Sequence, residues 1–101
     1  MVNKLIAYLG FAQKSGKLIF GVDNIEAKET KVSLAICDRT LSENSYNKLC
    51  NIVRRSDITL LLSDTSIDDM LNKKNCKAIG IASKELAKAI KELNLLEEVQ
   101  I

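Results

Sequence analysis

The chain has 101 residues, of which 47% are apolar, and this length predicts one small domain, residues 1–101. Its formal net charge of +2 is too small to argue by itself for a partner such as duplex nucleic acid. No segment is long and apolar enough for a membrane span or a secretory signal, so we expect a cytoplasmic protein without membrane contacts.

Residues 1–14 carry apolar side chains at helical spacing. The stripe consists of Val2, Leu5, Leu9 and Ala12. This spacing predicts an amphipathic helix, and Gly16 is the residue type that stops one.

A short strand and a poorly defined helix are expected next. Residues 17–20 end in an apolar triplet, which predicts a brief strand. Residues 22–30 predict a helix that has only Ile25 on its apolar face. Asp23 with Glu26 suits the start of that helix.

Three later runs are apolar at nearly every position. They are residues 34–37, 58–62 and 78–82. Continuous apolarity is typical of strands covered on both faces, as in parallel sheets. The sequence therefore predicts three buried strands.

Helical stripes separate and follow these strands. They are Tyr46, Leu49, Cys50 and Val53; then Ile67, Met70 and Leu71; and last Leu86, Ile90 and Leu93. The candidates for a capping box at the second stripe are Thr65 or Ser66 with Asp68 or Asp69. Ser83 is placed to cap the last helix.

Helices and strands thus alternate along the chain, beginning and ending with a helix. Such alternation predicts an α/β fold, a three-layer α/β/α sandwich. We expect its sheet to be small, four-stranded and mixed, but largely parallel.

The stretch "AQKSGKLIFG", residues 12–21, superficially resembles a nucleotide-binding loop. A P-loop has four residues between its first glycine and the Gly-Lys pair, whereas Gly10 and Gly16 enclose five. Leu18 replaces the metal-binding hydroxyl, and the cluster leads into a strand rather than a helix. We therefore expect no nucleotide cradle.

Catalytic and metal chemistry have little support. The chain has no histidine, and its three cysteines are widely spaced without a CxxC pair. Lys14 and Lys17 could form an activated amine pair, but solvated surface lysines are far commoner. We expect no enzyme activity, no cofactor and no metal site.

An anion-facing edge remains as the main hypothesis. Lys14 and Lys17 lead through the short strand to Gly21 and then to a helix start. Free amides at a helix start can hold a phosphate, and the side chains of Asp23 and Asn24 can hydrogen-bond base edges. The same two residues are also ordinary helix caps, so both interpretations stay open.

Two further basic groups allow ordinary explanations. The run Lys73-Lys74-Asn75 is typical of a solvated turn. Arg54 and Arg55 close a helix, where cations suit its dipole.

Three stretches together resemble a known family. They are "LGFAQKSGKLIFG", "KVSLAICDRTLSENSYNKL" and "LNKKNCKAIGIASKELAKAI". In order and spacing they resemble the bacterial YlxQ-like branch of the ribosomal protein L-seven-Ae and L-thirty-e superfamily. The resemblance implies an α/β/α sandwich that binds kink-turn RNA, a sharply bent duplex with tandem sheared G·A pairs.

The resemblance also assigns site residues. Gly21 matches the glycine that lets the backbone approach the RNA, and Asp23 and Asn24 match the residues that contact the guanines. Counting from Gly21 puts Ala27 at the position of a helix lysine, with Lys28 one place later. The loop before the last strand, which contains Lys73, Lys74, Asn75 and Cys76, is implied to lie against the same RNA.

We therefore expect a non-catalytic, ribosome-associated RNA-binding protein that acts in translation as part of a ribonucleoprotein and does not oligomerise. Its expected core site is Lys17, Gly21, Asp23, Asn24 and Lys28. Lys14, Lys73 and Lys74 are expected to add phosphate contacts. The alternative is a protein-interaction adaptor that uses the face bearing Ile19, Phe20 and Val22, and a small-molecule enzyme is a distant third.

Overall fold

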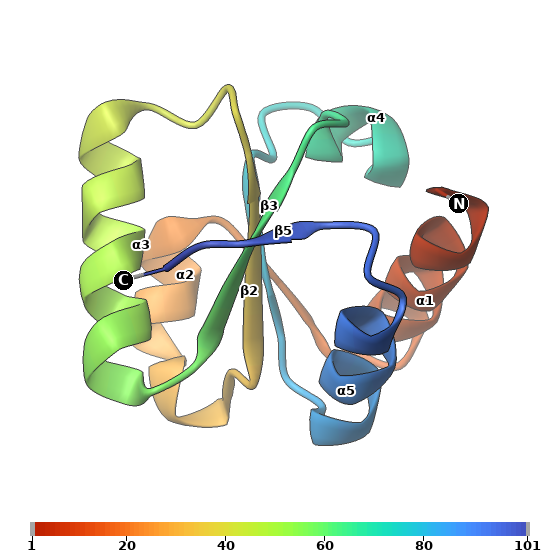
Figure 1. Cartoon of the computed structure of the whole chain (residues 1–101), viewed down its shortest axis with the longest axis horizontal. Coiled ribbons are helices and arrows are strands. Elements are labelled where there is room, and N and C mark those ends of the chain that lie inside the picture. The colour runs from red at the N-terminus through yellow and green to blue at the C-terminus, as the bar shows by residue number, and fades with distance from the viewer. Residues whose placement is uncertain (1, 101) are drawn as a thin grey trace.

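The computed structural model describes residues 2–100, and the Val2 side chain named above lies outside the described part. In chain order the elements are α1 (Val2–Lys14), β1 (Leu18–Phe20), α2 (Val22–Ala27), the 3-10 helix η1 (Glu29–Lys31), β2 (Leu34–Asp38), α3 (Glu43–Ser56), β3 (Thr59–Ser63), α4 (Ile67–Leu71), β4 (Ala78–Ile81), α5 (Lys84–Glu92) and β5 (Glu97–Glu98). Each predicted helix and strand is present, but the helix predicted over residues 22–30 ends at Ala27, and η1 and β5 are additional (Figure 1).

The fold is a mixed α/β fold with a five-stranded mixed sheet in the order β1-β4-β2-β3-β5. The expected sheet of four strands was wrong, because β5 pairs with the edge of β3. The expected largely parallel direction was also wrong. Within residues 2–100 only β2 and β3 pair in parallel, whereas β4 runs antiparallel to both of its neighbours and β5 runs antiparallel to β3.

The direction of β4 follows from the end of the sheet at which this strand begins. β2 and β3 end together, at Asp38 and Ser63, and β4 begins at the same end, where Ala78 pairs with Cys37. The five residues of α4 rise only about 7 Å, less than half the length of about 16 Å expected for five-residue β3. α4 therefore does not carry the chain back to the start of β3, and β4 begins at the end of the sheet where β3 stops and runs back alongside β2.

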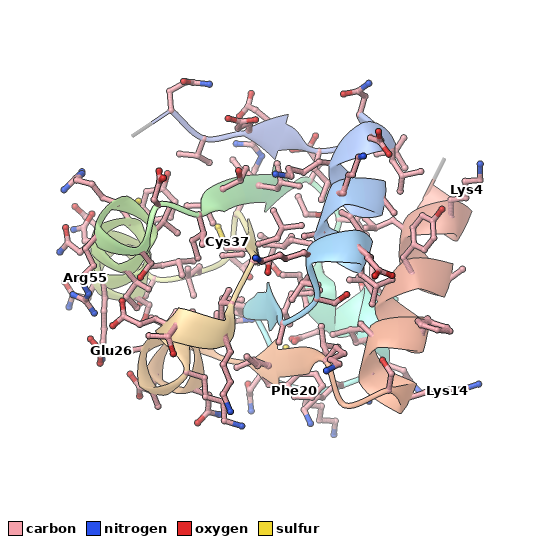
Figure 2. All side chains as sticks on the ribbon, turned by 90° about the horizontal axis from the view of Figure 1, so that it is seen from below. Lys4, Lys14, Phe20, Glu26, Cys37 and Arg55 are labelled. Carbon is pink, nitrogen blue, oxygen red and sulfur yellow. The ribbon has the colours of Figure 1, made fainter. Side chains whose placement is uncertain are left out.

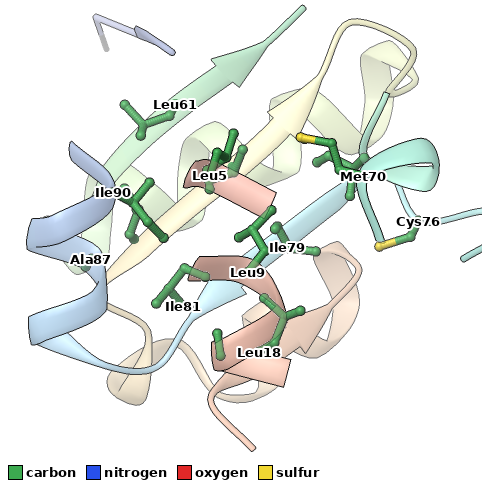
Figure 3. Close-up of a cluster of buried hydrophobic side chains, with 14 residues drawn as sticks. Leu5, Leu9, Leu18, Leu61, Met70, Cys76, Ile79, Ile81, Ala87 and Ile90 are labelled. Atoms are coloured by element: carbon green, nitrogen blue, oxygen red, sulfur yellow. The ribbon is translucent and has the colours of Figure 1, made fainter. Parts of the chain in front are cut away.

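Helices cover both faces of the sheet, which explains why its strands are apolar at consecutive positions. Figure 1 shows α2 and α3 on one side and α1, α4 and α5 on the other. Along β2, Leu34 and Ile36 belong to the core on the α1 side, and Ala35 and Cys37 belong to the core on the α3 side. Figure 3 shows the first of these cores, in which α1 and α5 meet β4. An unbroken apolar run therefore indicates that both faces of a strand are covered, but it does not indicate whether the strand runs parallel or antiparallel to its neighbours.

Close packing of α2 on the sheet depends on a small residue in β4. A Cβ atom at Gly80 would lie 3.2 Å from Ile25 Cγ1 and 3.3 Å from Val32 Cγ1. These distances are tighter than ordinary van der Waals contact. Gly80 therefore lets α2 and the segment after it approach the sheet.

The helix caps were predicted in part. The Ser83 hydroxyl accepts from the Leu86 N–H, so that cap is confirmed. The capping box expected at Thr65 or Ser66 was wrong, because Ser66 precedes α4 without a side-chain cap. The buried Asp38 carboxylate, at the end of β2, accepts the Ile67 N–H at 2.9 Å instead.

Over the described residues, two helices end at residues in the left-handed conformation, and none of the helices is ended by a proline. The chain has no proline and four glycines, and Asp57 and Asn72 take the left-handed backbone conformation at the ends of α3 and α4. Asp and Asn tolerate this conformation better than other residues with a side chain.

Over residues 2–100, no helix has the length and apolar character needed to cross a membrane.

Candidate nucleic-acid interface

A groove of about 330 Å³ opens where β1 ends and α2 begins, and we call it the Gly21 groove. Its lining residues are Gly21, Val22, Asp23, Thr40, Leu41, Ser42, Ser45, Asn75, Lys77 and Ala78. They come from the β1–α2 junction, the β2–α3 loop with the start of α3, and the loop that leads into β4. These three segments meet because β1, β2 and β4 share this end of the sheet.

Gly21 itself makes the turn into α2. Its φ of 87° and ψ of 152° lie in a region that is nearly restricted to glycine. Its N–H donates to the Ala78 carbonyl at 2.9 Å, and its carbonyl accepts the Ile25 N–H at 3.0 Å. A Cβ atom here would meet nothing within 4 Å, so the surface at Gly21 is open and the need for glycine is conformational.

The start of α2 differs from the sequence expectation. Gly21 occupies the N-cap position, so Asp23 and Asn24 lie inside the first turn and cap nothing. Val22 joins Ile25 on the buried face, although the sequence predicted Ile25 alone. Because neither polar side chain is used as a cap, both are available at the surface.

Asp23 is exposed and carries a compensated charge. Its side chain is 90% exposed, and its Oδ1 lies 2.7 Å from Lys48 Nζ of α3. The hydrogen bond from Lys48, followed by the lysine charge, lowers the pKa of Asp23. An anionic ligand therefore meets a carboxylate that is already paired with a cation.

Asn24 is also exposed, and its orientation is set by the backbone. Its Nδ2 donates to the Phe20 carbonyl at 2.8 Å. Among residues 2–100 this bond leaves the amide oxygen and one N–H free, so Asn24 can both accept from and donate to a ligand.

The loop between α4 and β4 lies beside this surface. Lys73 Nζ lies 4.1 Å from the centroid of the Phe20 ring, a cation–π contact that links the loop to β1. Asp68 holds the loop, because its carboxylate accepts the Cys76 N–H and its carbonyl accepts the Lys73 N–H at 3.0 Å. Lys73 and Lys74 are both exposed.

A second groove of about 600 Å³, which we call the lysine groove, contains other predicted residues. It is lined by Gly16, Lys17, Ile19, Lys28, Thr30, Lys31, Ser33, Ala82 and Lys84. The expected core site is thus divided, because Lys17 and Lys28 line this groove and not the Gly21 groove. Lys28 follows the end of α2 at Ala27, which takes its side chain away from the helix start. Lys14, Asn24, Lys73 and Lys74 line neither groove, and Lys14 points outward at the end of α1 (Figure 2).

Sequence reasoning missed several residues of the Gly21 groove. They are Thr40, Leu41, Ser42, Ser45 and Lys77 on its wall, and Lys48 behind Asp23, whereas Asn75 belongs to the loop that was expected to lie against the RNA. Lys48 is separated from Asp23 by 25 residues, so no local pattern indicates their pairing. Ser42 does carry a local signal, because it caps α3 by accepting the Ser45 N–H.

The apolar face proposed for the adaptor alternative is largely covered. Ile19 and Val22 are each only 8% exposed, and Phe20 is half-buried beneath Lys73. The exposed aromatic ring is instead Phe11 of α1, at 63%. Phe20 is therefore not a free apolar anchor.

Two of the three thiols, those of Cys37 and Cys76, are poor nucleophiles. Burial raises the pKa of the Cys37 thiol to about 12 and also raises the pKa of Cys76. All three cysteines are free. Within residues 2–100, no group of three or more metal-binding side chains could hold an ion.

Comparison with known proteins gives a fold and no function. No family model matches the chain, and no curated protein matches it. The chain is similar in structure to a protein of unknown function from Bacillus halodurans, with a TM-score of 0.78 and 16% sequence identity. The match covers 87% of this chain and 93% of that one. At this identity the likeness shows the fold alone.

Proposed function

We propose that the protein binds structured RNA of the kink-turn kind through the Gly21 groove, without catalysis. The observation that carries the proposal is the open turn at Gly21, flanked by the exposed side chains of Asp23 and Asn24. Lysines at positions 73, 74 and 77 belong to the neighbouring loop that leads into β4. Polar groups that can contact bases thus adjoin cations that can contact phosphates.

Recognition combines shape with a few base contacts. A regular A-form major groove is too narrow for side chains, so only a distorted RNA exposes guanine edges to a protein surface. The free amide groups of Asn24 can bond a base edge, and Asp23 can accept from an exocyclic amino group. Lys48 lowers the cost of placing the Asp23 carboxylate near phosphates, because it compensates that charge at 2.7 Å.

The arrangement of the fold supports the same proposal. Helices on both faces of the sheet fit a three-layer α/β/α sandwich, which the sequence resemblance implies for kink-turn-binding ribosomal proteins. In our proposal the protein works in the cytoplasm as a monomer and is associated with the ribosome. The adaptor alternative is not proposed, because its apolar face is covered.

The test is a binding titration with two RNAs. One is a kink-turn RNA, and the other is the same RNA with its G·A pairs converted to Watson–Crick pairs, each measured at two salt concentrations. We expect a preference for the kink-turn RNA that survives added salt. Equal binding to both RNAs that collapses with salt would leave only counterion release and would contradict the proposal. An absence of binding to either RNA would contradict it as well.

A further inference from the structure

The lysine groove lies at the opposite end of the sheet from the Gly21 groove. Lys17 directly precedes β1, Ser33 precedes β2 and Ala82 follows β4. The Ala82 N–H donates to the Lys17 carbonyl at 2.8 Å, which closes the floor between two of these segments. The four residues of β4 separate the two grooves by about 13 Å, so one phosphate group cannot occupy both.

The groove has a concentrated positive charge. The groove is lined by Lys17, Lys28, Lys31 and Lys84, which are all exposed, and no acidic residue of the described range 2–100 lines it. Among residues 2–100, the cations in ion pairs are Arg39, Lys48, Arg55 and Lys77. The four groove lysines are therefore unpaired in the described part of the chain.

The fold keeps nearby acidic groups away from this groove. Glu26 and Glu29 alternate in sequence with Lys28 and Lys31, but both carboxylates pair with Arg55 of α3, at 3.5 and 2.8 Å. Figure 2 shows Glu26 and Arg55 on neighbouring helices, on the side of α2 that faces α3. The segment 26–31 thus turns its acids toward α3 and its lysines toward the groove.

The chemistry of the lining favours a phosphate backbone over a base. In the part of the chain that the structure describes, no aromatic residue lines the groove, so these residues offer no platform on which bases could stack. Apart from the lysines, its polar side chains are the hydroxyls of Thr30 and Ser33, which can bond phosphate oxygens. Such contacts position a nucleic acid without reading its sequence.

We propose that the lysine groove is a second RNA-binding surface, which holds the sugar–phosphate backbone of a helical stem that flanks the RNA in the Gly21 groove. This inference rests on the proposed function, because it places one RNA across both grooves. The two surfaces have different tasks: the Gly21 groove discriminates the bent RNA, and the lysine groove adds affinity that does not depend on sequence.

The test compares two double variants with the same change in charge. Lys31→Ala/Lys84→Ala removes two groove lysines, and Lys88→Ala/Lys91→Ala removes two exposed lysines of α5 outside the groove. The dissociation constant of each is measured for the kink-turn RNA over a series of salt concentrations. Chemical unfolding of each variant checks that the fold is intact.

We expect the groove variant to reduce the slope of log affinity against log salt by about 2, since each phosphate contact contributes about 1. A fourfold rise in salt should then weaken its binding about 16-fold less than it weakens wild-type binding. The control variant should keep the wild-type slope. Shortening the flanking stems of the RNA, one at a time, should remove the difference between wild type and the groove variant for one of the stems.

The outcomes separate this inference from the proposed function. An unchanged slope in the groove variant, or an equal loss in both variants, would overturn the second surface while the preference for kink-turn RNA stands. A difference that persists with both stems shortened would also overturn it. A wild-type protein without that preference would overturn the proposed function and this inference with it.

Discussion

At the scale of single residues, Gly21 has the strictest requirement in the candidate interface. Its φ of 87° with ψ of 152° is costly for any residue with a Cβ atom, although a Cβ would have free space around it. Gly10 provides a contrast, because it lies within α1 and also has free space at the Cβ position. Because a Cβ atom has free space at both positions, the difference between alanine substitutions at the two glycines measures the cost of the Gly21 backbone conformation.

The substitution Gly21→Ala should lower the free energy of unfolding by about 1–3 kcal/mol, which is the usual cost of this backbone region. Gly10→Ala should raise it by about 0.5–1 kcal/mol, because alanine is the better helix residue. Urea unfolding of both variants measures these changes. Equal stability of Gly21→Ala and wild type would mean that residue 21 does not hold this conformation in solution.

Asn24 is the residue expected to distinguish the bent RNA from a regular duplex. Asn24→Ala should reduce the preference for kink-turn RNA over its Watson–Crick version by about 1–3 kcal/mol, the value of a good base contact. The matched control is Asn51→Ala, an exposed asparagine in the second half of α3, whereas Asn24 lies in the first turn of α2 beside Gly21. An unchanged preference in Asn24→Ala would show that another group reads the RNA.

At the scale of elements, α2 and η1 are held on α3 by charge as well as by packing. Asp23 and Glu26 share Lys48 at 2.7 and 3.2 Å, and Glu26 and Glu29 share Arg55 at 3.5 and 2.8 Å. Hydrogen bonds from Arg55, and then from Ser56, lower the pKa of Glu29 from 4.5 to about 2. This network fixes the orientation of the short helix that carries Asp23 and Asn24.

Glu29 should contribute to acid sensitivity. Its pKa is lower in the folded than in the unfolded state, so its stabilising effect is present above about pH 4.5 and is lost as the pH falls toward about 2. Glu29→Gln should therefore be less stable than wild type at pH 7, and the difference should narrow over that range. Unfolding at a series of pH values measures it, with Glu92→Gln, an exposed glutamate on α5, as the control. A difference that does not change with pH would contradict the assignment.

At the scale of the whole molecule, Asp38 links two segments that are distant in the sequence, the β2–α3 loop and the start of α4. It is 2% exposed at the end of β2 and accepts the Ile67 N–H at the start of α4 and the Thr40 N–H in the β2–α3 loop. Thr40 lines the Gly21 groove, and α4 leads into the loop that carries Lys73. One buried carboxylate thus sets two sides of the candidate interface.

Asp38→Ala should lower the free energy of unfolding by about 1–3 kcal/mol, because it leaves the buried Ile67 N–H without an acceptor. Asp64→Ala removes an exposed carboxylate that pairs with Arg39 at 2.6 Å, and it should cost less than about 1 kcal/mol. Denaturant unfolding compares the two. A similar small loss in both variants would show that Asp38 has no structural role beyond its charge.

Much of the architecture was predictable because the apolar pattern within each helix or strand indicates which of its faces are buried. The stripe Leu5, Leu9 and Ala12 marks the buried side of α1, and the continuous apolar run in β2 marks a strand covered on both faces. A helix start after Gly21 was also predicted, although Gly21 itself occupies the N-cap position in place of Asp23 or Asn24. Such patterns depend on neighbours within a few residues, which the sequence itself displays.

Only the tertiary structure decided which distant segments meet. In the structure β4 runs antiparallel to β2, and β5 joins the sheet beside β3. The Asp38 carboxylate, instead of a Ser66 cap, accepts the Ile67 N–H. The tertiary structure also paired Asp23 with Lys48 and placed Lys17 and Lys28 in the lysine groove, apart from Gly21 and Asp23. These contacts join residues separated by 25 or more positions, and their energies depend on how strands and helices pack in space. The local pattern of apolar residues does not indicate how distant elements pack. The sequence alone therefore determined the helices and strands, and only the tertiary structure determined which surfaces they form together.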